Sequence, residues 1–367
     1  MCIVLVRFIV QIKLRLGLSL LLCCGSLSAE HVLVYREAGR LGGWPANHGI
    51  WSWGNEILVG FSAAYHKEQP NTRHQQDPTK PEEPRLARSL DGGNTWTVES
   101  PRDLLPPAQG GRNGRDLVQP MDFNRPGFAM TFRFLDSNHG PSLFWFTYDK
   151  GKSWEGPFNF PQFGDGVLAR TDYLIEGPQE ALVFLSQAKT NGREGRPFCV
   201  RTANGGLTWK FVSYIGPEPS GFAIMPSTVR LRPQKLLTTV RVHEEKENRI
   251  DAFVSNDDAR TWTRLGPIAD TGEFGGNPPM LLKLRDSRLC LTYGYRAQPY
   301  SIRARLSRDG EHWGEIITIR DGASTWEVGY PRSVQRPDGK VVTVYYFNDG
   351  PHNERFIEAS IWDPNQP

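Results

Sequence analysis

Short apolar runs separated by turn residues recur through most of the sequence. Runs such as residues 143–148, 181–185 and 250–255 are rich in aromatic and β-branched side chains, which favour β-strands. The sequence also contains 37 Gly and 28 Pro, which is too many for a protein built mainly of long helices. The pattern therefore predicts an all-β protein made of many short strands.

A motif of the form Ser/Thr-x-Asp-x-Gly-x-x-Trp occurs five times among these runs. The copies begin at Ser89, Thr147, Thr202, Ser255 and Ser307. The third copy has Asn204 in place of Asp, the fourth has Ala259 in place of Gly, and the fifth is one residue shorter. Counted from the Asp or Asn position, consecutive copies are 58, 55, 53 and 52 residues apart. This spacing indicates a repeated structural unit.

Each copy of the motif predicts a tight hairpin turn. In such a turn the Asp or Asn side chain accepts hydrogen bonds from the amides of the turn, and Gly adopts a left-handed conformation. The Trp is expected to pack the turn onto its sheet. A period of 52 to 58 residues leaves room for four strands, which is the size of one blade of a β-propeller.

The length of the chain sets the number of blades. About 338 residues follow residue 29, so the period predicts a six-bladed β-propeller in a single domain spanning residues 30–367. The last blade lacks a motif copy and is expected to contain strands at residues 330–335, 341–347 and 356–362. The N-terminal strand, residues 31–35, is expected to join this blade and close the ring, which removes the exposed sheet edges.

With five such copies at blade spacing, the sequence resembles the sialidase superfamily, in which the motif is called the Asp-box or BNR repeat. The resemblance covers nearly all of residues 30–367 and implies the six-bladed propeller of that superfamily. It implies that the box residues are structural, because the boxes of the family lie on outer turns away from the active site. The implied active site contains three arginines for the substrate carboxylate, an Asp general acid/base, and a Tyr nucleophile whose proton is taken by a Glu.

Several positions match that implied site. Asp77 lies twelve residues before the first box, in the loop where the family has its acid/base Asp. Arg241 matches the second arginine, whereas Arg303 is the first choice for the third arginine and Arg296 the second choice. Tyr330, ahead of a Pro-Asp-Gly turn, matches the nucleophile. Arginine suits a carboxylate because its rigid fork donates two bonds, and Tyr needs a neighbouring base or positive charge to be activated. Each position also has a structural alternative: a solvated loop, an ion pair or a buried aromatic side chain.

Two positions depart from the family's pattern. Asn47 and His48 occupy the place of the first arginine, and residues 224–227 supply no carboxylate where the family has its Glu. Glu327, three residues before Tyr330, is one candidate for the missing base. His48 is the other, because the ordinary pKa of histidine suits proton transfer near neutral pH.

The departures argue against an ordinary neuraminidase and leave functions of two classes open. The first is an exo-acting glycoside hydrolase that acts on an acidic or other terminal sugar of a glycan or oligosaccharide, with a lyase that uses Tyr and His as a variant. The second is a propeller that binds carbohydrate or another surface without catalysis. Trp44, Trp51 and Trp53 either form a platform for a sugar ring or pack inside a blade.

Residues 1–29 form a separate segment. Three basic residues, Arg7, Lys13 and Arg15, precede an apolar stretch that leads into small residues, as in a secretory signal peptide. The stretch is too short and too interrupted by polar residues to span a membrane. The segment predicts a secreted or periplasmic protein with no membrane attachment after cleavage. A lipid anchor on one of its cysteines is the less favoured alternative.

The charge balance does not indicate a nucleic-acid partner. The full sequence has 43 Lys and Arg against 40 Asp and Glu, and the excess lies in residues 1–29. Acidic and basic residues alternate along the chain, whereas a protein surface that binds nucleic acid needs clustered Lys and Arg side chains. No metal, phosphate or dinucleotide motif occurs, so we expect no metal and no cofactor. Cys199 and Cys290 are expected to be free buried thiols, and the protein is expected to be a monomer.

Overall fold

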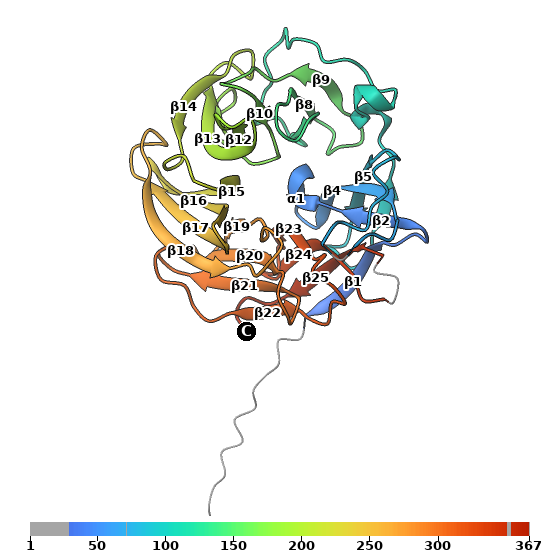
Figure 1. The fold of residues 1–367 in the computed structure, drawn as a ribbon. Coiled ribbons are helices and arrows are strands. Elements are labelled where there is room, and N and C mark those ends of the chain that lie inside the picture. The colour runs from blue at the N-terminus through green and yellow to red at the C-terminus, as the bar shows by residue number, and fades with distance from the viewer. Residues whose placement is uncertain (1–28, 71, 351–353, 367) are drawn as a thin grey trace, which may run out of the picture.

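Six antiparallel sheets surround a central axis in the computed structural model, which describes residues 29–70, 72–350 and 354–366 (Figure 1). Each sheet forms one blade, so the predicted six-bladed β-propeller is confirmed. The predicted signal peptide, residues 1–29, lies outside the described residues except for Ala29. No helix in the described ranges has the length and apolar character needed to cross a membrane.

The blades follow one another along the chain. Blade 1 contains β2 (Arg40–Gly43), β3 (Ile50–Trp53), β4 (Glu56–Tyr65), β5 (Glu83–Ser89) and β6 (Thr97–Glu99). Blade 2 contains β7 (Ala129–Phe134), β8 (Ser142–Thr147) and β9 (Glu155–Asn159). Blade 3 contains β10 (Val167–Leu168), β11 (Tyr173–Ile175), β12 (Ala181–Ala188), β13 (Glu194–Thr202) and β14 (Lys210–Tyr214).

The second half of the ring is more regular. Blade 4 contains β15 (Phe222–Arg232), β16 (Lys235–Glu244), β17 (Glu247–Ser255) and β18 (Thr263–Asp270). Blade 5 contains β19 (Met280–Lys283), β20 (Leu289–Tyr295), β21 (Ser301–Ser307) and β22 (Ile317–Arg320). Blade 6 contains β23 (Gly329–Gln335), β24 (Val341–Phe347), β25 (Phe356–Trp362) and β1 (Glu30–Tyr35). The described helices are short: α1 (Pro45–His48), η1 (Arg102–Leu104) and η2 (Pro107–Gln109).

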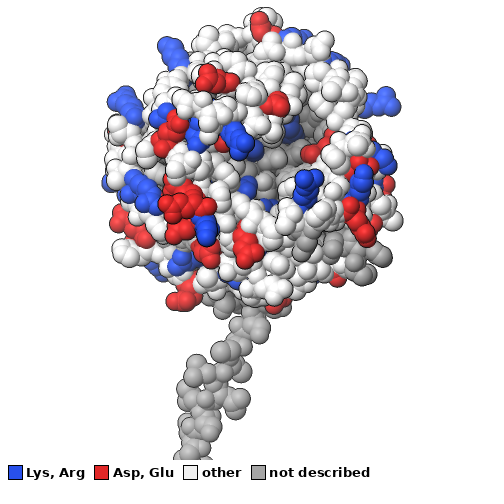
Figure 2. Space-filling view, in the orientation of Figure 1, with Lys and Arg blue, Asp and Glu red and all other residues white. Residues whose placement is uncertain are grey.

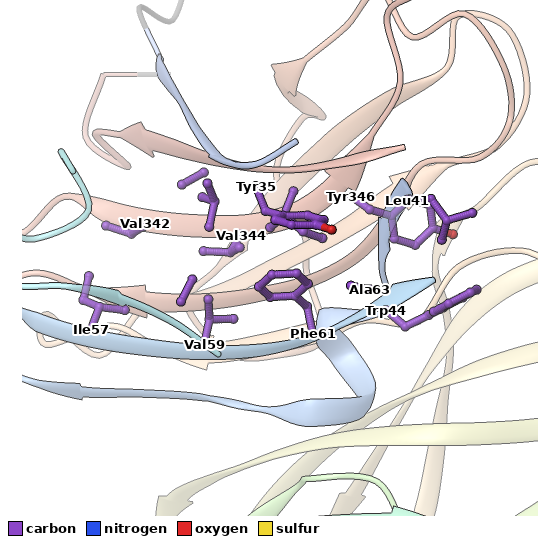
Figure 3. Packing of buried hydrophobic residues seen from close by; sticks show 14 of the residues in the cluster. Tyr35, Leu41, Trp44, Ile57, Val59, Phe61, Ala63, Val342, Val344 and Tyr346 are labelled. Atoms are coloured by element: carbon purple, nitrogen blue, oxygen red, sulfur yellow. The ribbon is translucent and has the colours of Figure 1, made fainter. Parts of the chain in front are cut away.

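The N-terminal strand closes the ring as the sequence predicts. Strand β1 pairs antiparallel with β25, and the register places Glu30 opposite Ile361. Blades 1 and 6 then bury a shared apolar layer, in which the Phe61 ring of β4 points toward the Tyr35 ring of β1, with ring centres 5.2 Å apart (Figure 3). Every residue of β24 is buried, because neighbouring blades cover both faces of its sheet.

The Asp-box hairpins have the geometry that the motif predicts. In the first box, Asp91 Oδ1 accepts bonds from Ser89 Oγ at 2.8 Å and from the Thr95 amide at 2.9 Å. The box glycines have positive φ, and in the fourth box Ala259 adopts the same conformation with φ of 70°. The Trp side chains pack against their sheets, and Trp154 is the most deeply buried of them. Cys199 and Cys290 are free and buried, as expected.

The box hairpins make the fold sensitive to acid. Hydrogen bonds from the Thr261 side chain and amide lower the pKa of Asp257 to about 2. A carboxyl whose folded pKa is depressed contributes stability above its unfolded pKa of about 4, and this contribution is lost as pH falls toward about 2. We therefore expect the melting temperature to fall more steeply over this range in the native protein than in D257N. Calorimetry at several pH values measures this difference, and equal slopes for the two proteins would contradict it.

The topology places one set of loops together at one end of the axis. The boxes connect the third and fourth strands of their blades, so they lie on the opposite face from the loops that join second to third strands and one blade to the next. We call the face that carries these latter loops the mouth face. Its loops include residues 66–82, 271–279 and 296–300, whereas residues 44–49 and 169–172 interrupt the first strands of blades 1 and 3.

Candidate active site

Tyr330, at the start of β23, lies next to the axis on the mouth face. Its hydroxyl accepts a hydrogen bond from Arg241 Nη1 at 2.9 Å. The guanidinium carbons of Arg241 and Arg296 lie 5.8 and 5.6 Å from the centre of its ring, and the charge of Arg170 also acts on it. These three arginines, from blades 3, 4 and 5, are called the arginine cage below. Figure 2 shows that the ring is hollowed at its centre and that Lys or Arg atoms are visible in the hollow.

The arginine cage changes the ionisation of Tyr330. Burial by itself raises the pKa of the phenol, but the charges of the cage outweigh burial, so the pKa of Tyr330 is lowered. The ring of Tyr346 lies 5.7 Å away, and burial raises the pKa of that second phenol. Tyr330 is therefore the tyrosine of this pair that loses its proton first.

A loop that sequence reasoning missed, residues 271–277, holds these groups in place. Its contacts are Arg241 Nε to the Gly275 carbonyl at 2.8 Å, Arg296 Nη1 to the Gly276 carbonyl at 2.8 Å, and the Tyr330 amide to Asn277 Oδ1 at 2.8 Å. Both glycines have positive φ, and an added Cβ at Gly276 would lie 2.4 Å from Thr271 Oγ1. One loop thus positions two arginines and the tyrosine together.

The structure distinguishes the two candidates for the third arginine. Arg296 is 2% exposed and donates to the Phe274, Gly276 and Val328 carbonyls and to the Tyr346 hydroxyl. Protein acceptors therefore occupy four of its five N–H groups, and it contributes charge and position more than free donors. Arg303, the first choice from the sequence, lies over the Tyr295 ring at 3.5 Å and donates to Ser301 Oγ. The structure brings Arg296, and not Arg303, to Tyr330.

Glu327 lies three residues before Tyr330 but faces a different partner. Its carboxylate bonds to His74 Nδ1 at 2.6 Å and accepts from the Gln75 amide at 3.2 Å, and Arg355 Nη1 lies 3.4 Å away. Burial raises the pKa of Glu327, but Arg355 and His74 lower it more, so the net shift is downward. Glu327 is thus a fixed anion beneath His74.

A cavity of about 500 Å³ adjoins the arginine cage between blades 1 and 2. Blade 2 has three described strands, and its box lies between β8 and β9, so β7 forms the edge nearest the axis. Residues 132–135, in and just after β7, form one wall, and Asn47 and His48 of α1 form another. Asn47 Oδ1 accepts from Arg170 Nε at 3.2 Å, which joins the cavity to the cage.

His48 is a buried member of this cavity wall. Its Nε2 bonds to Ser62 Oγ at 2.8 Å, whereas its Nδ1 is buried without a hydrogen-bond partner among the described residues. Burial, aided by Arg133 and Arg332, holds the pKa of His48 well below its usual value. His48 is therefore neutral, and the structure does not bring it into contact with Tyr330.

Two carboxylates of the 66–82 loop differ in their surroundings. Asp77 Oδ1 accepts from the amide and hydroxyl of Thr79, which are the leading causes of its lowered pKa. Glu82 lines the cavity, and burial raises its pKa. Asp77 therefore stays ionised within its own loop, whereas Glu82 is the carboxyl of this loop that retains a proton more readily.

A third carboxyl lies on the axis beneath the cage. Burial raises the pKa of Asp172 to about 7, although the charge of Arg332 opposes this shift. Both residues line a cavity of about 10 Å³, which has room for one water molecule. Arg332 Nη2 also donates to the carbonyls of Ala46 and Thr171, so it ties α1 to the axis.

The remaining predictions concern packing and metals. Trp44 and Trp51 are buried, and Trp53 packs against the cluster that contains Trp51, so these side chains fill the blades. Within the part of the chain that the structure describes, no group of three or more His, Cys, Asp or Glu side chains is arranged to hold a metal ion. The site residues that sequence reasoning did not assign are Arg170, His74, Glu82 and Asn277. All four lie in loops or at strand ends, where no periodic pattern marks them.

Comparison with known proteins supports the fold and gives its family. The model of the BNR repeat-like domain matches residues 85–343. Among functionally curated proteins, no sequence matches this chain significantly.

Solved structures resemble the chain at low sequence identity. A protein of unknown function from Dyadobacter fermentans has 21% identity and a TM-score of 0.72, and the match covers 91% of this chain and 98% of that one. A mutant of Trypanosoma rangeli sialidase that displays trans-sialidase activity has 15% identity, a TM-score of 0.58, and coverage of 92% and 59%. The NanB sialidase of Streptococcus pneumoniae has 13% identity, a TM-score of 0.60, and coverage of 91% and 71%. This chain therefore spans about 59% of the trypanosomal sialidase's length.

Proposed function

Because this chain belongs to the BNR repeat-like domain family, we propose that its arginine cage is the active site of a glycoside hydrolase for a terminal acidic sugar. Tyr330 is the nucleophile in this proposal. The observation that carries it is the contact of a tyrosine hydroxyl with Arg241 Nη1 at 2.9 Å, with Arg296 over the same ring at 5.6 Å; these charges and that of Arg170 lower the pKa of Tyr330 against the effect of burial. A phenol becomes a useful nucleophile when neighbouring positive charge favours its ionised form. Tyr346, whose pKa is raised, supplies no such group.

The cage also favours an anionic substrate. Arg170 is paired with both oxygens of Glu194, whereas Arg241 and Arg296 have no carboxylate partner among the described ion pairs. The site therefore has excess positive charge even when Tyr330 is ionised. Among the described residues, no protein group accepts a hydrogen bond from Arg241 Nη2. This nitrogen is therefore free to donate to a carboxylate of the substrate.

The proposed reaction has two steps. In the first, the Tyr330 oxygen bonds to the anomeric carbon while the glycosidic C–O bond breaks, and the leaving oxygen takes a proton. In the second, water attacks the same carbon and loses a proton, and Tyr330 leaves as a phenolate that the cage stabilises. The trypanosomal and streptococcal structures are named as sialidases, so sialic acid is the first sugar to test.

A propeller that binds an acidic sugar without turning it over is the competing function. The observation that favours it is Met225, which lies with φ of 55° at the place where the sequence resemblance implies a carboxylate base. A binding protein needs the positive cage but no base. The two functions differ in turnover, which is directly measurable.

Turnover of purified mature protein tests the proposal. The probes are 4-methylumbelliferyl glycosides of sialic acid, glucuronic acid and galacturonic acid, with sulfated glycans and a neutral glucoside for comparison. We expect fluorescence release from at least one acidic glycoside and none from the glucoside. Saturable binding of an acidic sugar without release would support the binding propeller instead.

We further propose that residues 1–29 direct export and are removed, so the enzyme acts in the periplasm or outside the cell. Their basic, apolar and small-residue regions support this location. N-terminal sequencing of the protein recovered from the producing cell tests it, and a retained Met1 would contradict it.

A further inference from the structure

His74 has the surroundings of a catalytic histidine. Its Nδ1 bonds to Glu327 Oε1 at 2.6 Å, and the Glu327 side chain is 2% exposed. Arg355, whose side chain is fully buried, lies 3.4 Å from the same oxygen and pairs with this carboxylate. Arg355 and the imidazole thus share Oε1 of the buried anion, whereas the Gln75 amide bonds to its Oε2, so both oxygens are held.

This contact sets the tautomer of His74. An ionised carboxylate only accepts hydrogen bonds, so Nδ1 carries the hydrogen and Nε2 has the free lone pair. The side chain is 37% exposed, and among the described residues no protein group bonds to Nε2. A buried carboxylate on Nδ1 and an Nε2 without a described protein partner form the arrangement that orients a proton-transfer histidine.

Aromatic rings join His74 to the arginine cage. The imidazole lies between Trp44 at 5.7 Å and Trp326 at 5.1 Å, measured between ring centres. The guanidinium carbon of Arg296 lies 5.1 Å from the centre of the Trp326 ring and 5.6 Å from that of Tyr330. Trp326 thus contacts both His74 and Arg296, and Arg296 in turn lies over Tyr330.

We propose that His74 is the catalytic general acid and base of this site and that Glu327 and Arg355 position it; this rests on the proposed function. In the first step His74 Nε2–H gives its proton to the leaving glycosidic oxygen as the Tyr330 oxygen bonds to the anomeric carbon. In the second step neutral Nε2 takes a proton from the attacking water as the bond to Tyr330 breaks. Atoms and charges balance, because the imidazolium and phenolate are restored together.

The starting state of the proposed reaction differs from a neutral pair only in where one proton lies. Protonated His74 with ionised Tyr330 contains the same number of protons as neutral His74 with a Tyr330 phenol, so the two forms are tautomers of one site. Burial lowers the pKa of His74, the hydrogen bond to Glu327 raises it, and the charges of Arg355 and Arg296 lower it further, so the net shift is downward. Glu327 is thus the group that opposes this shift and favours the protonated imidazole.

Two substrates with one sugar and different leaving groups test the role of His74. The methylumbelliferone leaving group of the first substrate departs without a proton donor. The methanol leaving group of a methyl glycoside of the same acidic sugar needs one. For H74Q we expect kcat/KM, which reports the first step, to fall by about 10²- to 10⁴-fold on the methyl glycoside and by less than about tenfold on the methylumbelliferyl glycoside. H139Q, at a histidine on a surface loop, is the matched control and should change neither value.

Glu327→Gln provides a second measurement that does not depend on H74Q. Glu327 raises the pKa of His74, so its amide replacement should move the limb of the pH–rate profile that reports His74 to lower pH. A residue that only supports the fold would change stability without moving this limb.

The outcomes separate this inference from the proposed function. Absence of turnover by the native protein would overturn both. Turnover with equal losses on the two substrates in H74Q, or with an unshifted profile in Glu327→Gln, would overturn the role of His74 alone. The role of His74 would also be overturned if E82Q, and not H74Q, selectively lost activity on the methyl glycoside, because Glu82 would then be the proton donor.

Discussion

Replacing Tyr330 by Phe is expected to lower kcat on the acidic glycoside by at least about 10³-fold, because the variant lacks the oxygen that bonds to the anomeric carbon in the proposed reaction. The ring contacts with Tyr346 and Ala46 remain in the variant. The lost hydrogen bond from Arg241 is expected to cost about 1–3 kcal/mol, so the protein stays folded. Steady-state kinetics and the melting temperature measure the two effects separately.

Tyr295→Phe is the matched control for this prediction. Tyr295 is also a tyrosine of the mouth-face region, but its ring lies beneath Arg303 and not in the arginine cage. We expect native kcat from this variant. Retention of more than a tenth of the native kcat by Tyr330→Phe would contradict a nucleophilic role for Tyr330.

Arg296→Ala is expected to have the largest effect on stability, about 3–5 kcal/mol in the free energy of unfolding. The substitution removes a buried guanidinium that donates to three carbonyls and a phenol, and it leaves those acceptors without partners. It also removes a charge that lowers the pKa of Tyr330, so the remaining activity should need higher pH. Urea unfolding and the pH–rate profile measure the two consequences.

Arg303→Ala distinguishes this account from the first choice that the sequence offers. Arg303 is only half-buried and bonds to Ser301 in its own strand, so we expect a loss of about 1 kcal/mol or less and little change in kcat. Equal destabilisation of the two variants, or a larger kinetic loss in Arg303→Ala, would show that the arginines have been assigned in the wrong order.

Local sequence signals were sufficient to predict the fold. The boxes form hairpins through contacts between residues at most a few positions apart, such as Thr147 with Asp149, so each copy predicts its own turn. The expected strands at residues 341–347 and 356–362 coincide with β24 and β25, because their aromatic and β-branched runs are bounded by turn residues. Blade 2 is less regular than the period implies, since no described strand lies inside β7.

The site was only partly predictable. Arg241 lies on the second strand of blade 4 and Tyr330 on the first strand of blade 6, where a polar residue in an apolar strand is conspicuous, and the structure brings them together at 2.9 Å. The choice between Arg303 and Arg296 depends on the 295–300 turn and on a loop from the previous blade, which no strand pattern specifies. His74 and its partner Glu327 are more than 250 residues apart in the chain, so only closure of the ring reveals their contact.

The central claim is that Tyr330 forms a covalent bond to an acidic sugar. Its most direct test is mass spectrometry of the native protein after incubation with 2,3-difluorosialic acid and, separately, with 2-deoxy-2-fluoroglucuronosyl fluoride, which slow hydrolysis of a glycosyl-enzyme. We predict a mass increase of one fluorinated glycosyl group, located on the peptide that contains Tyr330 and absent in Tyr330→Phe. An adduct on another residue, or continued turnover of the acidic glycoside with an unsaturated sugar as product and no adduct, would contradict the account.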